Sequence, residues 1–142
     1  MSAVSFLQEH IFLTFSAFLL CMTSCEGNTR YEVWVSNQSD QTIRVEHRNR
    51  RLIEADSFFV ASVLEPGEAR LLVTIDWLGG RADPAEPPEV LDSIAVFNEA
   101  EMQSSFPWRQ PEVWIIESHH DRKIPSQWRH TYLNVVTESS FQ

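Results

Sequence analysis

The stretch YEVWVSNQSDQTIRVEHR, residues 31–48, decides the fold of this chain. Residues 31–36 alternate between apolar and other side chains, and a period of two over six residues is typical of a half-buried strand. Residues 37–40 (NQSD) have the composition of a turn, and residues 41–48 resume the alternation. The stretch therefore predicts two antiparallel strands joined by a turn, the clearest hairpin in the sequence.

The same two-residue period recurs along the rest of the chain. It predicts further strands at residues 57–64, 69–77, 92–98, 102–106, 113–117 and 129–137. Pro66 and Gly67 fit a type II turn, because proline fixes φ at its second position and glycine supplies φ > 0 at its third. Three prolines and two glycines within residues 79–89 predict an exposed loop. We also expect a polar connection at residues 119–123 and a single helical turn at residues 125–128.

About eight strands, spaced about 8–12 residues apart and without a segment of helical period, predict an all-β fold. We expect one antiparallel, immunoglobulin-like β-sandwich of about seven to eight strands over residues 30–142. A chain of 142 residues is long enough for one such domain with its own core.

An apolar segment precedes this domain. Residues 11–22 are interrupted only by Thr14 and Ser16, and at about a dozen residues they fall short of the ~20 that a helix needs to cross a bilayer. This length fits the apolar region of a signal peptide. The small residue Ser24 stands directly before Cys25, as bacterial lipoprotein signal peptidases require.

The sequence therefore predicts that residues 1–24 are a lipoprotein signal peptide, cleaved between Ser24 and Cys25, with lipid attached to Cys25. Residues 25–29 would form a very short tether. The absence of Lys or Arg before Arg30 departs from the usual positive start of a signal peptide. Two alternatives stay open: an ordinary secretion signal or uncleaved anchor, and a buried apolar helix with an incidental cysteine.

Charge and cysteine content restrict the classes of partner. Removal of residues 1–24 takes away one acid, Glu9, and no Lys or Arg, so the net charge changes from −9 to −8. An acidic chain without basic patches is unsuited to nucleic acid or to anionic lipid headgroups. Both cysteines lie within the first 25 residues, so the mature domain is expected to contain no internal disulfide.

Five tryptophans provide the candidate ligand-binding residues. Trp34 falls on the more polar face of its strand, and Trp108 lies in a loop between two prolines. Exposed, rigid aromatic side chains form flat platforms that bind sugars or peptides. The alternative is that most of the tryptophans complete a core that has no disulfide. Trp108 is the best candidate for an exposed contact, followed by Trp34.

The sequence offers little support for catalysis or metal binding. His119, His120 and Asp121 form the most metal-like cluster, but adjacent residues of a strand point to opposite faces. The serines show no nucleophile-elbow context. We therefore expect no catalytic residue, no metal and no cofactor.

Short motifs along the chain resemble those of small lipoproteins of Bacteroidota-type bacteria, most of them of unknown function. They are Ser24-Cys25-Glu26, the strand VWVSN at residues 33–37, Pro66-Gly67-Glu68, DSIAVF at residues 92–97, and the ending at residues 132–141. The resemblance implies lipidation and a β-fold, and it implies no catalytic residues.

These observations together predict a non-enzymatic lipoprotein of the cell envelope, anchored outside the cytoplasm on the periplasmic face or the outer-membrane surface. Its domain is expected to contact another envelope protein, and no nucleic acid. The alternative is a carbohydrate- or small-ligand-binding module that uses Trp108 and Trp34. A flat apolar patch or an open edge strand would favour the protein partner, whereas co-planar exposed aromatic rings would favour the glycan.

Overall fold

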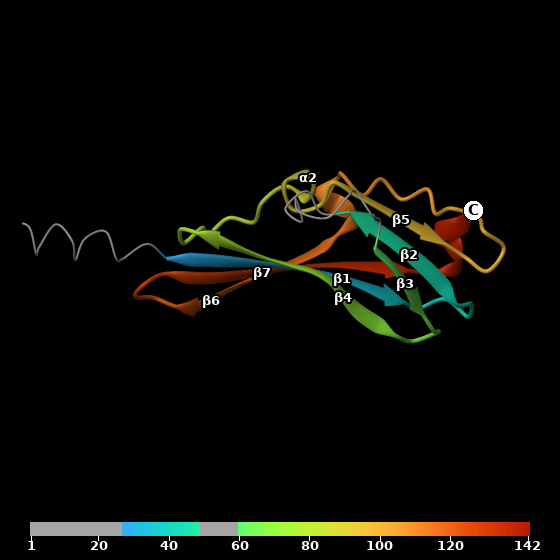
Figure 1. Cartoon of the computed structure of the whole chain (residues 1–142), viewed down its shortest axis with the longest axis horizontal. Helices are drawn as coiled ribbons and strands as arrows, with labels where there is room; N and C mark the ends of the chain where they lie inside the picture. The colour runs from blue at the N-terminus through green and yellow to red at the C-terminus, as the bar shows by residue number, and fades with distance from the viewer. Residues whose placement is uncertain (1–26, 49–59) are drawn as a thin grey trace, which may run out of the picture.

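The computed structural model describes residues 27–48 and 60–142, and it folds them into two packed β-sheets (Figure 1). Among these residues there are seven strands. The first sheet has the order β4 (Ala69–Leu78), β1 (Asn28–Asn37), β7 (Gln127–Val136) and β6 (Ile115–Arg122). The second has the order β3 (Val60–Leu64), β2 (Ile43–Arg48) and β5 (Ser93–Phe97). The prediction of a mostly β domain with two sheets is confirmed.

Three short helical segments complete the described part of the chain: α2 (Pro87–Val90) and 3-10 turns at Pro111–Val113 and Glu138–Phe141. Within the described residues, no helix has the length and apolar character needed to span a membrane. The predicted signal segment, Ser24 and Cys25 lie outside the described residues, as do residues 49–59.

The prediction that all strands are antiparallel is wrong for the centre of the first sheet. β1 pairs antiparallel with β4 but parallel with β7, from Asn28 opposite Gln127 to Asn37 opposite Val136. A parallel pair cannot be closed by a tight turn and needs a long connection. Here the connection is almost the whole domain, so the alternation of side chains could not reveal the direction of the pairing.

The predicted hairpin of residues 31–48 is also wrong, because β1 and β2 belong to different sheets. The buried side chain of Asn37 explains the crossing. Its amide nitrogen donates to the carbonyls of Gln41 (2.8 Å) and Leu64 (3.0 Å), and its oxygen accepts from the backbone N–H and the hydroxyl of Ser39 (3.1 and 2.7 Å). These bonds fix a bend that carries the chain from one sheet to the other.

Other boundaries differ from the sequence-based expectation. β1 begins at Asn28, so it includes two residues assigned to the tether. Residues 102–106 form no strand beyond a single bridge from Gln103 to Phe97. β6 runs on to Arg122 and therefore includes most of the expected polar connection, and a turn with the start of β7 replaces the helical turn expected at residues 125–128. The predicted strand at 57–64 is described only from Val60.

The core lies between the sheets and follows the alternation read from the sequence. Tyr31, Val33 and Val35 are each at most 1% exposed and face the second sheet. They pack in one cluster with Ile43 and Val96 from the second sheet. Burial of such side chains is the main source of stability in a domain held without disulfides.

We expect Asn37→Ala to lower the free energy of unfolding by about 2–4 kcal/mol, because two interior carbonyls lose their donor. Urea denaturation followed by tryptophan fluorescence measures this change. The matched control is Gln38→Ala, since the neighbouring Gln38 is exposed. Equal losses in the two variants would show that the polar bend does not hold the sheets together.

Candidate functional site

Four apolar side chains form a line across the outer face of the first sheet. Leu71 of β4 lies opposite Trp34 of β1, Trp34 opposite Leu133 of β7, and Leu133 opposite Ile115 of β6. We call these four residues the apolar row. Leu71 and Ile115 are 40% and 53% exposed, and Trp34 and Leu133 between them are half-buried.

A β-bulge helps to assemble the apolar row. The register of β1 and β4 shifts between Val33 and Trp34, so that Val33 faces Val73 whereas Trp34 faces Leu71. The extra residue, Leu72, is half-buried and packs against the core. Bulges redirect side chains in this way without ending the strand, and this one places Leu71 beside Trp34 on the outer face.

The rest of this outer face differs on the two sides of the apolar row, with small or apolar side chains on one side and polar or charged side chains on the other. Beside the apolar row, toward the C-terminal end of β1, lie Ser36, Ala69 and Val135. In the other direction lie two polar rows: Thr74, Glu32, Thr131 and Glu117, then Asp76, Arg30, Arg129 and His119. Arg30 donates to Asp76 over 2.9 Å, and this hydrogen bond lowers the pKa of the Asp76 carboxyl. The apolar row is thus bordered by charge on one side only.

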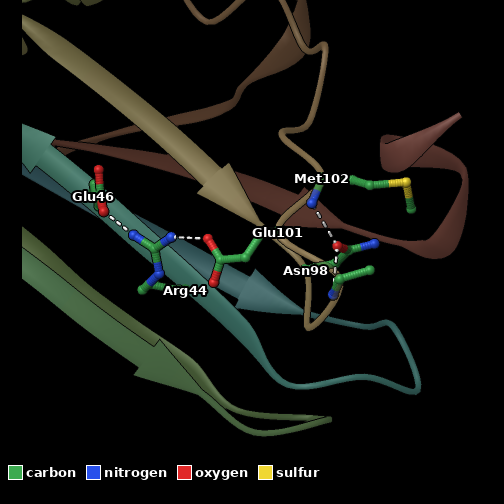
Figure 2. Close-up of polar contacts among 6 residues, drawn as sticks. Arg44, Glu46, Asn98, Glu101 and Met102 are labelled. Carbon is green, nitrogen blue, oxygen red and sulfur yellow. Dashed lines mark hydrogen bonds and ion pairs between the residues drawn. The ribbon is translucent and has the colours of Figure 1, made fainter.

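The outer face of the second sheet has a different character (Figure 2). Arg44 of β2 lies between the carboxylates of Glu46 and Glu101 and pairs with both. Its guanidinium also lies 4.4 Å from the centre of the Phe97 ring. Asn98 fixes the loop that brings Glu101 there, since its side-chain oxygen accepts from the N–H of Met102 over 2.9 Å. Charges on this face compensate one another.

The two tryptophans proposed as ligand contacts do not share a surface. Trp34 points to the outer face of the first sheet, whereas Trp108 is half-buried and packs against the core on the inner side. The carbonyl of Trp108 accepts a hydrogen bond of 2.7 Å from the indole of Trp114, and the Arg109 guanidinium lies 4.8 Å from the Trp108 ring centre. A role of Trp108 in ligand binding stays a prediction.

The structure adds a polar cluster that sequence reasoning missed. His130 is fully buried, with Nδ1 2.8 Å from the Ser118 hydroxyl and Nε2 2.8 Å from the carbonyl of Arg81. Because a carbonyl only accepts, Nε2 carries a proton. Tyr132, two residues along β7, donates to the carbonyl of Ala85 over 2.6 Å, and burial raises the pKa of its phenol. Both side chains hold the loop after β4 against the sheet. The alternation of residues 129–137 puts His130 and Tyr132 on one face of their strand, and this was the only sign of the cluster in the sequence.

The histidines of β6 point to opposite faces, as adjacent strand residues do. His119 lies 3.7 Å from Glu117 on the outer face, and His120 stacks on Trp128 with ring centres 4.2 Å apart. Over residues 27–48 and 60–142, no three His, Cys, Asp or Glu side chains are grouped closely enough to hold a metal ion.

The fold and this site define a class of protein: a small two-sheet β domain with an apolar row on one outer face. Comparison of the chain with protein-family models, with curated proteins and with solved structures gave no match. Of the residues predicted for a site, only Trp34 lies in the apolar row, and its three partners come from strands distant in sequence.

We expect Trp34→Ala to lower the free energy of unfolding by only about 1 kcal/mol, because Trp34 contributes cross-strand contacts on an open face. Tyr31, three residues earlier in β1 and on its inner face, is the matched comparison. Tyr31→Ala is expected to cost about 3–5 kcal/mol through the cavity it leaves in the core. Thermal and urea unfolding measure both changes, and equal losses would show that Trp34 serves the fold.

Proposed function

We propose that this chain is an envelope lipoprotein, anchored through lipid on Cys25, whose domain binds another envelope protein at the apolar row. The observation that carries the proposal is the alignment of Leu71, Trp34, Leu133 and Ile115 across four strands. Contiguous apolar side chains on the surface of a small domain mark sites of protein contact.

The composition of the apolar row fits a protein partner better than a sugar. A central tryptophan surrounded by aliphatic side chains has the make-up of an interface hot spot. The polar rows beside it, with the Arg30–Asp76 pair, supply the solvated rim that such interfaces have. Glycan platforms depend on several aromatic rings, and the apolar row contains one.

The anchor is supported by the apolar segment at residues 11–22 and by Ser24 before Cys25. Two or three acyl chains, at about 0.8 kcal/mol per buried CH₂, hold a protein on a membrane almost permanently. The resemblance of short motifs, Ser24-Cys25-Glu26 among them, to those of small Bacteroidota-type lipoproteins implies the same anchor. The domain would then act outside the cytoplasm as a non-enzymatic binding module.

We propose further that the sandwich is immunoglobulin-like in its architecture. Four and three strands in two sheets are the numbers of a constant-type immunoglobulin domain. The parallel pair of β1 and β7 departs from the wholly antiparallel sheets of that type. The likeness therefore concerns the layers and strand number, and not the order of the strands.

Replacing Cys25 by alanine tests the anchor. We expect the wild-type chain to incorporate labelled palmitate and to partition into the detergent phase, and Cys25→Ala to do neither, because the acceptor thiol is gone. Cys21→Ala is the matched control and should behave as wild type. Retention of label in the Cys25 variant would contradict the proposal.

The apolar row is tested by placing a photo-cross-linker at Leu71 in the native envelope. We expect a discrete cross-linked product that falls about 30-fold in yield on adding Trp34→Ala, the effect of losing a hot spot of about 2 kcal/mol. A cross-linker at Glu46, on the outer face of the second sheet, should give no such product. Identical products from both positions would contradict a site at the apolar row. Binding of a glycan that is abolished by Trp108→Ala would favour the alternative, a carbohydrate-binding module.

A further inference from the structure

One end of the first sheet gathers three segments that are far apart in the sequence. Asn28 pairs with Leu78 on one side and with Gln127 on the other, and its N–H donates to the carbonyl of Ser126 over 2.8 Å. The carbonyl of Gly27 accepts from the N–H of Gly79 over 2.7 Å. We call residues 27–28, 78–80 and 122–127 the N-terminal tip, because the chain enters the domain there (Figure 1).

The N-terminal tip carries the two most exposed large apolar side chains among the described residues. Leu78 is 88% exposed and Ile124 is 79% exposed, whereas the others reach at most 53%. Isolated exposed leucines are common on protein surfaces. Here, however, two such side chains lie at the end of the domain where the chain enters it. Their transfer from water to an apolar environment would be favourable.

Two positive charges accompany these apolar side chains. Arg122 and Lys123 directly precede Ile124, and neither has an ion pair within the described part of the chain. The nearby Arg30 and Arg129 differ, since they are neutralised by Asp76 and Asp121. In a chain with a net charge of −9, the described residues of the N-terminal tip therefore present two positive charges without an ion pair.

The backbone of the N-terminal tip is held in place. Gly27 and Gly80 pack so closely against Ser126 that neither position has room for a side chain. A Cβ atom on Gly27 would lie 2.0 Å from the carbonyl oxygen of Ser126, and one on Gly80 would lie 2.6 Å from the Ser126 Cβ. The Thr29 hydroxyl bridges the segments, since it donates to the carbonyl of Gly79 over 2.7 Å and accepts from the N–H of Arg81 over 2.8 Å. The exposed side chains thus project from a fixed scaffold, which reduces the entropy lost when they bind.

We propose that the N-terminal tip lies in the headgroup layer of a bilayer containing anionic lipids. Leu78 and Ile124 insert toward the acyl chains, and Arg122 and Lys123 contact the lipid phosphates. Apolar side chains flanked by Arg and Lys are the combination that binds membrane interfaces. This inference rests on the proposed anchor, since two peptide links keep the Cα of Cys25 within about 7 Å of that of Gly27.

A second copy of the chain is a poorer occupant of the N-terminal tip. A two-fold contact between tips would bring Arg122 and Lys123 of one copy toward the same residues of the other, because such contacts use the same patch on both subunits. Like charges placed together in a contact disfavour it. An anionic bilayer covers the same apolar side chains and compensates the charges.

The test uses the fact that Lys123 is the only lysine of the chain. The lipidated full-length protein is added to preformed vesicles of phosphatidylglycerol and phosphatidylethanolamine, and acetylation of Lys123 by a water-soluble amine reagent is followed by peptide mass spectrometry. Met102→Lys supplies an internal reference lysine at an exposed position in the segment that follows β5, and β5 ends at the other end of the sandwich from the N-terminal tip (Figure 1). We expect Lys123 to react about tenfold more slowly than the reference. This is the rate expected if only about a tenth of the molecules have Lys123 out of contact with lipid and accessible to the reagent.

Two comparisons make the result decisive. Leu78→Ser with Ile124→Ser is expected to restore the reactivity of Lys123 to that of the reference while the protein still floats with the vesicles. Protection that persists in this double variant, or wild-type Lys123 that reacts as fast as the reference, would overturn the insertion of the tip and leave the lipid anchor standing. A wild-type protein that does not float with the vesicles would overturn both proposals.

Discussion

The parallel pairing of β1 with β7 is the constraint on which the rest of the structure depends. It joins the first and last strands over the whole ten-residue length of β1. Since β1 also pairs with β4 from Asn28 to Ser36, all positions of β1 but the last have neighbours on both sides. The inner side of this pairing places Tyr31 and Tyr132 in the core, and its outer side places Trp34 against Leu133. One register therefore determines the core, the apolar row and the N-terminal tip together.

Much of the local structure was predictable from the sequence, because alternation identifies strands and their buried faces. Tyr31, Val33 and Val35 were correctly assigned to one face, and that face is buried. The partner of each strand was not predictable, because a period of two is compatible with any neighbour. Asn37 shows why: its turn-like surroundings favour a hairpin, yet its bonds to the carbonyls of Gln41 and Leu64 require the second sheet to be in place.

In the candidate site, too, the faces of single strands were predictable from the sequence and the pairing of strands was not. Trp34 could be assigned to an outward face from its own strand alone, but Leu71 joins it only through a bulge and Leu133 only through a parallel pairing across almost the entire domain. Trp108 was selected for its proline-flanked loop; its ring is half-buried and packs against the core, and its role in ligand binding stays a prediction. Composition also predicted a chain unsuited to anionic headgroups, and this stays a prediction. A net charge is an average over the chain, however, and among the described residues Arg122 and Lys123 before Ile124 have no ion pair.

Geometry makes the two proposed surfaces compatible. Trp34 lies six residues beyond Asn28, and at a rise of about 3.3 Å per strand residue the apolar row stands about 20 Å from the N-terminal tip. The charged rows of Arg30 and Glu32 lie between them on the same face. If the tip rests in the headgroups, these charges remain in water above the bilayer and the apolar row faces sideways. A partner protein can then reach Trp34 without displacing lipid, whereas a membrane lying flat on this face would have to desolvate the Arg30–Asp76 pair. Charge placement thus separates the proposed lipid-facing end of the sheet from its proposed protein-facing side.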